Sequence, residues 1–358
     1  MRWPAGLAGP LYESSAEVQS RVLGSPRGGG YAEARVQHRR IVLLALLVMP
    51  AAALRAAGRG GSARIGILSG LAAGPEAMRF LEPITARLAE LGFVEGRNLE
   101  VEYRFAEGKL ERAPALAAEL LAREPDVLVA VGPIATSAAA ATKSVPVVVL
   151  LVNDPVAQGF AQSMARPGGH VTGVGTWGLE LVAKRLQLLK ELAPGVKRVG
   201  LFDNAHSQPM PEVDRLDFER RSGLAIVLVR AGGPDEFDAA FATLARERVT
   251  GLIVSADPMI YLNRARIAQL CTQHKMLSVW GHRSYLDVGG LASYQSDFAE
   301  ALRRGAAIID KVLRGAKPAE IPFEQATKLE LVVNLKAAKA LGIVVPASLL
   351  MAANEVIE

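Results

Sequence analysis

The chain has 358 residues, which exceeds the usual size of one domain, so we expect two cores or one elongated α/β body. Half of the residues are hydrophobic and only 5% are aromatic, a composition that favours helices packed on buried parallel strands. The formal charge is +5, but residues 1–57 hold seven arginines and three acidic residues, which leaves 34 basic and 33 acidic residues of the 41 and 36 in the whole chain. A near-neutral body without a Lys or Arg run lacks the basic footprint that phosphate binding requires, so we expect no nucleic acid partner.

The N-terminal region predicts export. A basic segment at residues 38–40 precedes the apolar run Ile41–Met49, and small residues follow. This order is typical of a secretory signal peptide, which we place at about residues 36–57, with cleavage near Ala53 or Ala57. The apolar run is shorter than the roughly 20 residues that span a bilayer. We therefore expect a soluble periplasmic protein.

Residues 1–35 do not fit ahead of a signal peptide, whose basic region normally lies near the start of the chain. They are rich in Gly, Pro and Ser. We hypothesise that they are not translated in the cell and that synthesis begins near Val36. N-terminal sequencing of the precursor would contradict this if it recovered a peptide from residues 1–35.

Strand and helix patterns alternate along the rest of the chain. In the first half, the expected strands are Ala63–Leu68, Leu99–Arg104, Val127–Val131 and Val147–Leu151, and the expected helices are Pro75–Leu91, Leu110–Ala122 and Ala135–Thr142. The segment Val171–Gly175 then leads into a helix over Leu179–Leu192. The rhythm restarts with strands at Arg198–Phe202, Ala225–Val229 and Gly251–Ser255, and helices at Pro211–Arg221, Asp235–Arg246 and Tyr261–His274. The segments Leu277–Trp280 and Gly290–Tyr294, the helix Asp297–Leu313, the strand Leu329–Val333 and the helix Leu335–Ala340 complete the pattern. This alternation predicts the α/β class, with two doubly wound parallel-sheet lobes.

Small or polar residues follow the predicted strands. In doubly wound sheets, ligands bind beyond the carboxyl ends of the strands. Several of these residues begin helices, where free backbone N–H groups and the helix dipole favour a carboxylate, so the sequence predicts a small, amino-acid-like ligand. The candidate ligand-binding residues are Ser69, Gly70, Gly132, Pro133 and Asp154 in the first lobe, and Asn204 and Asp257 in the second.

Structural roles remain open at these positions. Asp154 and Asp257 each precede a proline, so both also fit plain helix capping with proline in the first turn. Gly132 could serve only a tight turn, although glycine also lets the backbone approach a ligand closely. Tyr294 and Trp177 lie near the expected crossovers, where they could stack on a flat ligand group or pack in the hinge.

Motifs for catalysis and metal binding are absent. The chain has no G-x-S-x-G elbow, no H-E-x-x-H helix, no cysteine pair and no G-x-x-x-x-G-K-[ST] loop. The glycines around the first strand do not match a dinucleotide fingerprint, and the five histidines are too scattered for a metal site. Cys271 is the only cysteine, and we expect it to be a small buried filler. The sequence thus indicates no enzyme, no cofactor and no metal.

Short segments spread over the body occur in a family-specific order. They are Arg64–Ser69, Leu91–Asn98, Tyr103–Gly108, Asn153–Val156, Arg166–Gly173, Ala256–Pro258, Gly289–Tyr294, Arg314–Pro318, and Pro322 through Leu341–Ile343 to Pro346. On these segments, the chain from about Arg64 to Glu358 resembles the family of ABC transporter substrate-binding proteins with the type I periplasmic-binding fold. Some members of that family bind aromatic amino acids.

The resemblance implies two lobes joined by three crossing segments. Lobe 1 would hold residues 63–175 and 283–320, and lobe 2 would hold residues 176–282 and 321–358. It also implies a small-molecule ligand, and a partner permease with its ATPase that provides the only link to the membrane. Carried over position by position, the cleft residues of the family fall on Ser69, Gly132, Pro133, Asp154, Asn204, Asp257 and Tyr294. The chain departs from the family at Gln295, where glycine is frequent, and in the loop 203–208, so the identity of the ligand stays open.

The expected mechanism is hinge closure, in which a ligand bridges both lobes of a monomer and shifts an open population to a closed one. In this hypothesis Asp154 holds an ammonium or hydroxyl group of the ligand. Gly132 and Ser69 offer N–H or hydroxyl groups to a carboxylate. Asp257 and Asn204 latch the ligand from the second lobe.

Other classes of protein share this fold. A transcription regulator would need a helix-turn-helix ahead of the first lobe, where the export signal stands instead. An enzyme would need a nucleophile and a base that converge in the cleft, and the sequence shows no such pair. A binding protein that feeds a receptor in place of a permease stays open.

Overall fold

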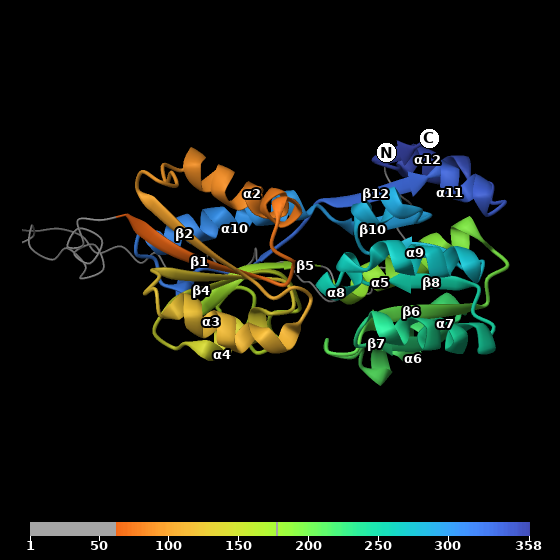
Figure 1. Ribbon diagram of the computed structural model, residues 1–358, viewed down its shortest axis with the longest axis horizontal. Helices are drawn as coiled ribbons and strands as arrows, with labels where there is room; N and C mark the ends of the chain where they lie inside the picture. Colours follow the sequence, from red (N-terminus) through yellow and green to blue (C-terminus); the bar gives the residue numbers. More distant parts are fainter. Residues whose placement is uncertain (1–61, 177) are drawn as a thin grey trace, which may run out of the picture. The chain divides into compact units, whose positions relative to one another are not determined.

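The computed structural model describes residues 62–176 and 178–358, which form two α/β lobes, each built on one sheet (Figure 1). The predicted fold class is confirmed, because both sheets are mostly parallel and carry helices on their faces. The predictions for residues 1–57 and the candidate Trp177 lie outside the described residues. Among the helices of the described ranges, none combines the length and the apolar character that crossing a membrane requires.

The first sheet has the strand order β11-β5-β4-β3-β1-β2, and every neighbouring pair is parallel. Its strands are β1 (Ala63–Ser69), β2 (Leu99–Phe105), β3 (Val127–Val131), β4 (Val147–Asn153), β5 (Val171–Thr176) and β11 (Glu324–Gln325). Its helices are α2 (Pro75–Glu90), α3 (Ala113–Leu121), α4 (Ala135–Ala141) and α10 (Phe298–Leu313), with short 3₁₀ turns η1 (Leu110–Arg112) and η4 (Pro318–Glu320).

The centre of this sheet is buried on both faces. All five residues of β3 are buried, and their side chains alternate between two apolar clusters. One cluster joins the sheet to α2 and α10, and the other joins it to α3 and α4, which lie on the opposite face (Figure 1). A strand covered on both faces needs apolar residues at every position, which explains the continuous apolar runs in the sequence.

The second sheet has the order β13-β12-β10-β9-β8-β6-β7 and is parallel except for the pair β10–β12. Its strands are β6 (Arg198–Asn204), β7 (Ala225–Ala231), β8 (Gly251–Val254), β9 (Leu277–Trp280), β10 (Ala292–Ser296), β12 (Leu329–Asn334) and β13 (Glu355–Ile357). Its helices are α5 (Gly178–Leu192), α6 (Glu212–Ser222), α7 (Phe237–Arg246), α8 (Pro258–Leu262), α9 (Arg264–Gln273), α11 (Leu335–Ala340) and α12 (Ala347–Ala352), with turns η2 (Pro234–Glu236) and η3 (Arg283–Val288).

The chain passes between the two sheets after β5, after β10 and after β11. The predicted return to lobe 1 at residues 283–320 starts and ends too early. Residues 292–296 pair with β9 and β12 of the second sheet, and α10, which follows them, packs on the first sheet. Residues 324–325 still pair with β5 of the first sheet. Strand pairing decides which lobe a segment joins, and the sequence pattern does not reveal pairing partners.

The other differences from the predicted elements are short. The helix predicted over Tyr261–His274 is two helices, α8 and α9, that meet at Asn263. The first of them begins earlier, because Asp257 caps it and Pro258 occupies its first position. The short elements β11, β13 and α12 were not predicted, since two to six residues carry too little periodic signal.

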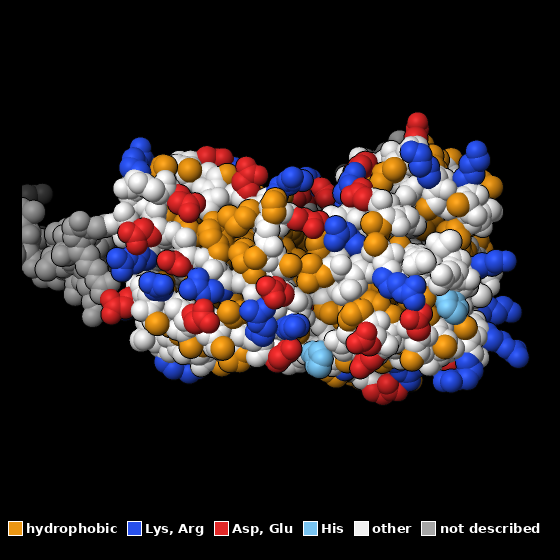
Figure 2. Space-filling view, in the orientation of Figure 1, with side chains coloured by type: hydrophobic (Ala, Val, Ile, Leu, Met, Phe, Trp, Pro, Cys, Tyr) orange, Lys and Arg blue, Asp and Glu red, His pale blue; other side chains and the backbone are white. Residues whose placement is uncertain are grey.

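Charged side chains of both signs are interspersed over the face of the molecule in Figure 2. Many of them pair locally, as Arg266 does with Asp238 (2.7 Å) and Arg303 with Glu90 (2.9 Å). Exposed pairs of this kind each contribute little to stability.

Candidate functional site

The predicted ligand-binding residues of the first lobe begin at the carboxyl end of β1. Ser69 is 1% exposed, and its Oγ accepts a hydrogen bond from the N–H of Leu71 at 3.3 Å. A Cβ placed on Gly70 would lie 2.7 Å from Cγ of Pro258 in the first turn of α8. The loops that follow β1 and β8 therefore touch, and a side chain at position 70 would collide with the proline ring.

Gly132 and Pro133 connect β3 to α4. Gly132 has a φ of +83°, which favours glycine, and a Cβ built on it would meet no atom within 4 Å. The space beside Gly132 is therefore open. Its N–H donates to the carbonyl of Leu150 at 2.8 Å, so this N–H is already engaged, and the exposed Pro133 has no N–H to offer.

Asp154 caps the turn that follows β4. Its Oδ1 accepts hydrogen bonds from the N–H groups of Val156 (3.1 Å) and Ala157 (3.0 Å), and the side chain is exposed. Asp154 thus caps a turn and not the helix that the sequence left open, because no described helix lies between β4 and β5. This cap does not exclude a ligand contact, because the second carboxylate oxygen accepts no hydrogen bond from a described residue.

Asn204 and Asp257 meet in the second lobe. Nδ2 of Asn204, the last residue of β6, donates to Oδ1 of Asp257, the N-cap of α8, at 3.0 Å. The same Oδ1 accepts the N–H of Met259 at 2.8 Å, and Oδ2 accepts the hydroxyl of Ser207 at 3.1 Å. Both side chains are buried, with 1% of Asn204 and 5% of Asp257 exposed. The Asp257 carboxylate is therefore held by three donors of its own lobe.

A second carboxyl group lies beside this network. Oδ1 of Asp203 accepts the hydroxyl of Ser255 (2.7 Å) and the N–H of Asn204 (2.9 Å). Burial raises the pKa of Asp203 above its ordinary value. Burial also raises the pKa of Asp257, and the nearby charge of Asp203 adds to that rise. The end of β6 and the loop after β8 thus bring together one half-buried and one buried acidic group.

Tyr294 lies in β10 and packs against the same apolar cluster as α5. Burial raises the pKa of its hydroxyl, which has no hydrogen-bond partner among the described residues. The Tyr294 carbonyl accepts a hydrogen bond from Nε of Arg185 at 2.8 Å. A hydrogen bond thus holds the backbone of Tyr294, while its hydroxyl has no partner among the described residues and could bind a ligand.

Arg185 was not among the predicted site residues. It is only 7% exposed, and it lies on the buried stripe of α5 with Leu181, four residues before it, and Leu189, four residues after it. A charged residue inside an apolar helical stripe is visible in the sequence. That signal could have identified Arg185.

Further contacts join the two lobes at α8 and η3. Oε1 of Glu76 on α2 accepts hydrogen bonds from the hydroxyl of Tyr261 and from Nη2 of Arg264, at 2.5 and 2.9 Å. The His282 ring lies 6.3 Å from the Phe80 ring and 5.3 Å from the Phe298 ring, centroid to centroid, and both phenylalanines belong to the first lobe. These contacts join α2 and α10 of the first lobe to α8, α9 and the residue that caps η3.

The His282 ring is held neutral by its surroundings. Burial lowers the pKa of His282 to about 4, and the positive charge of Arg264 acts in the same direction. Its Nδ1 accepts the N–H of Ser284 at 3.2 Å, which a neutral ring permits. An uncharged ring is thus the form that packs among the aromatic groups of both lobes.

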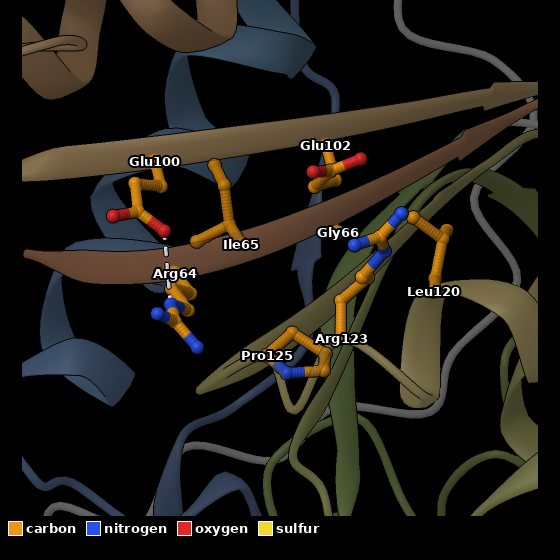
Figure 3. Close-up of a pocket in the computed structure, with 8 residues that line it drawn as sticks. All are labelled: Arg64, Ile65, Gly66, Glu100, Glu102, Leu120, Arg123 and Pro125. Carbon is orange, nitrogen blue, oxygen red and sulfur yellow. Dashed lines mark hydrogen bonds and ion pairs between the residues drawn. The ribbon is translucent and has the colours of Figure 1, made fainter.

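The pocket drawn in Figure 3 lies elsewhere. It encloses about 160 Å³ and is lined by Arg64, Ile65, Gly66, Glu100, Glu102, Leu120, Arg123 and Pro125. These residues include the beginnings of β1 and β2, whereas Ser69 stands at the far end of β1. Arg64 is paired with Glu100 at 2.9 Å. The pocket therefore does not include any of the predicted ligand-binding residues.

The predicted residues come together only in part. Asn204 and Asp257 are in direct contact, and Gly70 contacts the helix that Asp257 caps. Within the described ranges, Gly132, Pro133 and Asp154 make no hydrogen bond to any of these residues. Cys271 is buried as predicted, and burial raises the pKa of its thiol to about 12. Within residues 62–176 and 178–358, no group of three His, Cys, Asp or Glu side chains could share a metal ion.

Comparison with known proteins extends these observations. Residues 69–357 match the model of a family described as ABC transporter substrate binding protein. The chain is also similar to a tyrosine-binding protein of Clostridioides difficile (strain R20291), with 24% identity over 257 residues, which are 71% of this chain and 74% of the relative.

Solved structures of similar proteins show the same fold. One is the ABC domain from Streptococcus pneumoniae in complex with L-Trp, with 26% identity and a TM-score of 0.73 over 83% of this chain and all of that one. Another is a conserved domain protein from Vibrio cholerae, with 24% identity and a TM-score of 0.74 over 82% of this chain and 99% of that one. Both likenesses extend over the two lobes.

Proposed function

The chain belongs to the family of ABC transporter substrate-binding proteins, and from this premise we propose that it captures an amino acid or a closely related compound for import. The ligand binds at the carboxyl ends of the strands of both lobes, which then close around it. The closed form is the one that a membrane permease and its ATPase receive. The protein performs no reaction of its own.

The observation that carries this proposal is the contact between the binding edges of the two lobes. The loop after β1 touches the first turn of α8 through Gly70 and Pro258, and Glu76 bonds Tyr261 and Arg264 across the same junction. A molecule held near these loops would meet groups from both lobes. Such a ligand stabilises the closed form by its differential affinity for the two states.

The proposed class of ligand is inferred from two similar proteins. The C. difficile relative is named a tyrosine-binding protein, and the S. pneumoniae structure holds L-Trp. We propose an amino acid for this chain as well, with Tyr294 beside its side chain and Asp154 near its ammonium group. The buried network of Asn204 and Asp257 shapes the second-lobe wall, because its hydrogen bonds fix both side chains.

The proposed location is the periplasm. It follows from the family and from the signal peptide that the sequence predicts at residues 36–57. The proposal places the binding lobes outside the cytoplasm, where an importer collects its substrate.

Thermal unfolding against a panel of compounds tests the function. The panel holds the twenty standard amino acids, nucleosides, sugars and small organic acids. A ligand at a hundred times its dissociation constant should add about 2.7 kcal/mol to the free energy of unfolding. A rise in the unfolding midpoint with one or a few amino acids supports the proposal. A rise with sugars or nucleosides alone, or with no compound, contradicts it.

A further inference from the structure

Arg185 is a buried cation at the hinge end of the second lobe. It lies in the second turn of α5, the helix that follows the first crossing between the sheets. Helical side chains lean toward the N-terminus of their helix, so Arg185 reaches back toward that crossing. Its Nε donates to the carbonyl of Tyr294, two residues before the end of β10, where the chain crosses again. Arg185 thus lies between two of the three crossings.

No acidic residue within residues 62–176 and 178–358 pairs with this charge. The bond to Tyr294 is the only hydrogen bond that the Arg185 side chain makes to a described residue, and the described residues provide no ion pair for it. Burial lowers the pKa of Arg185 to about 10, and interaction with the phenol groups of Tyr285 and Tyr294 opposes this shift. By contrast, Arg283 in the same lobe pairs with both Asp287 and Glu355.

Arg185 is only 7% exposed and has no acidic partner among the described residues, although its Nη atoms keep some contact with water. Such a group is costly, so its presence requires a reason. Removing a charge from water without a partner costs several kcal/mol, which proteins normally offset with a carboxylate. Bracing the Tyr294 carbonyl is not a sufficient reason, because any neutral donor would serve a carbonyl oxygen. Strongly perturbed charged groups of this kind gather where ligands bind.

The free part of the guanidinium has a specific shape. Because Nε is occupied, Nη1 and Nη2 remain, and they present two parallel N–H groups at the end of the side chain. Two parallel donors match the two oxygens of a carboxylate. A second unpartnered polar atom stands nearby in β10. Ser296 lies two residues after Tyr294, on the same face of the strand, and its Oγ is buried without a hydrogen-bond partner.

We propose that Arg185 is the receptor for the carboxylate of the ligand, with Ser296 as an additional donor to it. This inference rests on the proposed function and deepens it. The second lobe then holds the carboxylate end of an amino acid, in place of Ser69 and Gly132, which the sequence suggested for that role. The N–H of Gly132 is engaged by Leu150, which agrees with this exchange of roles.

The test begins with the ligand-free protein. Arg185→Met keeps much of the length and apolar volume of the side chain but removes the charge. If Arg185 serves to bind the carboxylate of the ligand, this variant unfolds at the same temperature as the wild-type full chain or at a higher one. If Arg185 is a structural brace, the variant unfolds at a lower temperature, and that result overturns the proposal. Lys184→Met, at the exposed neighbouring position on α5, is the matched control for any general effect of a methionine on this helix.

Binding is then measured by calorimetric titration with the twenty standard amino acids, and with the carboxamides of those that bind. The wild-type chain should bind the acids and lose at least about a hundredfold in affinity for the carboxamides. Arg185→Met should lose a similar factor for the acids and should no longer distinguish acid from amide. Arg185→Lys should show an intermediate loss, because lysine keeps the charge without the paired geometry.

The outcomes separate this inference from the proposed function. If the amino acids bind the wild-type chain and Arg185→Met equally well, Arg185 is not the receptor, and the proposed function stands. If no amino acid binds the wild-type chain, both proposals fail. If the amide binds as tightly as the acid, the carboxylate is not recognised, and the assignment is overturned.

Discussion

The two lobes share one architecture but differ at the ends of their strands. In the first lobe, Gly132, Pro133 and Asp154 are small or exposed; the N–H of Gly132 bonds the neighbouring strand, and Asp154 caps a local turn. In the second lobe, Asn204 and Asp257 are buried and bonded to each other. The first lobe therefore offers backbone groups and open space to a ligand, whereas the second offers polar side chains that hydrogen bonds hold in place. Specific recognition should therefore depend more on the second lobe.

The largest loss of stability should come from a substitution where two strands of the first lobe approach each other closely. A Cβ at Gly173 in β5 would lie 1.8 Å from the carbonyl oxygen of Val149 in β4. The obstacle is backbone, which cannot move aside, so Gly173→Ala should lower the free energy of unfolding by more than about 3 kcal/mol. Urea unfolding measures this. Gly169→Ala is the control, because a Cβ there would meet no atom within 4 Å. Equal effects of the two variants would contradict the account.

The second prediction compares the two capping carboxylates. Asp257→Ala leaves the side chains of Asn204 and Ser207 and one backbone N–H without an acceptor, and should lower the free energy of unfolding by about 3 kcal/mol. Asp154→Ala removes an exposed cap and should cost about 1 kcal/mol. Chemical denaturation measures the free energy of unfolding of both variants. A larger loss for Asp154→Ala would reverse the distinction between the lobes.

The third prediction concerns pH at the junction of the lobes. Burial lowers the pKa of His282 to about 4, from an ordinary value of 6.5. Between these values the unfolded chain binds a proton that the folded chain does not, so stability falls as the pH falls. The free energy of unfolding should fall by about 2 kcal/mol between pH 8 and pH 5.

His282→Asn tests this contribution. Asparagine keeps an acceptor for the N–H of Ser284 but does not titrate, so the variant should lose about 2 kcal/mol less between pH 8 and pH 5 than the wild-type chain. The free energy of unfolding is measured at both pH values. His206→Asn, at an exposed position of the same lobe, is the control for the replacement of a histidine by asparagine. An unchanged dependence in His282→Asn would show that another group is responsible.

The smallest effect should come from the exposed bonds between the lobes. Glu76→Gln weakens the contacts with Tyr261 and Arg264 and so favours the open form. Because Glu76 is more than half exposed, we expect a loss of only about threefold in affinity for the amino acid that the panel identifies. Glu82→Gln on the same helix is exposed and makes no ion pair to a described residue, so it is the control in the same calorimetric titration.

The sequence predicted the centre of the first sheet because β3 is apolar at every position. Val127–Val131 and Leu335–Ala340 were placed at their observed bounds, since burial and periodicity leave a local signal. The path of residues 283–326 was not predicted correctly. Membership of a lobe there depends on which strands pair, and pairing is decided by contacts between distant segments.

The candidate site was predictable in position but not in detail. Parallel sheets direct attention to the strand ends, so Asn204 and Asp257 could be named from the sequence. Their bond to each other depends on the spacing of β6 and β8, which is a property of the folded sheet. Arg185 was missed because it lies inside a helix, far along the chain from Tyr294, whose carbonyl it binds.

Small-angle X-ray scattering with and without a bound amino acid measures whether the lobes close. In the proposed mechanism, a ligand that is bound to the second lobe also binds the first, so the lobes close around it. We expect a smaller radius of gyration at saturation in the wild-type chain, and no change in Arg185→Met at the same amino acid concentration. A radius that stays constant while calorimetry shows the wild-type chain to be saturated would contradict closure between the lobes.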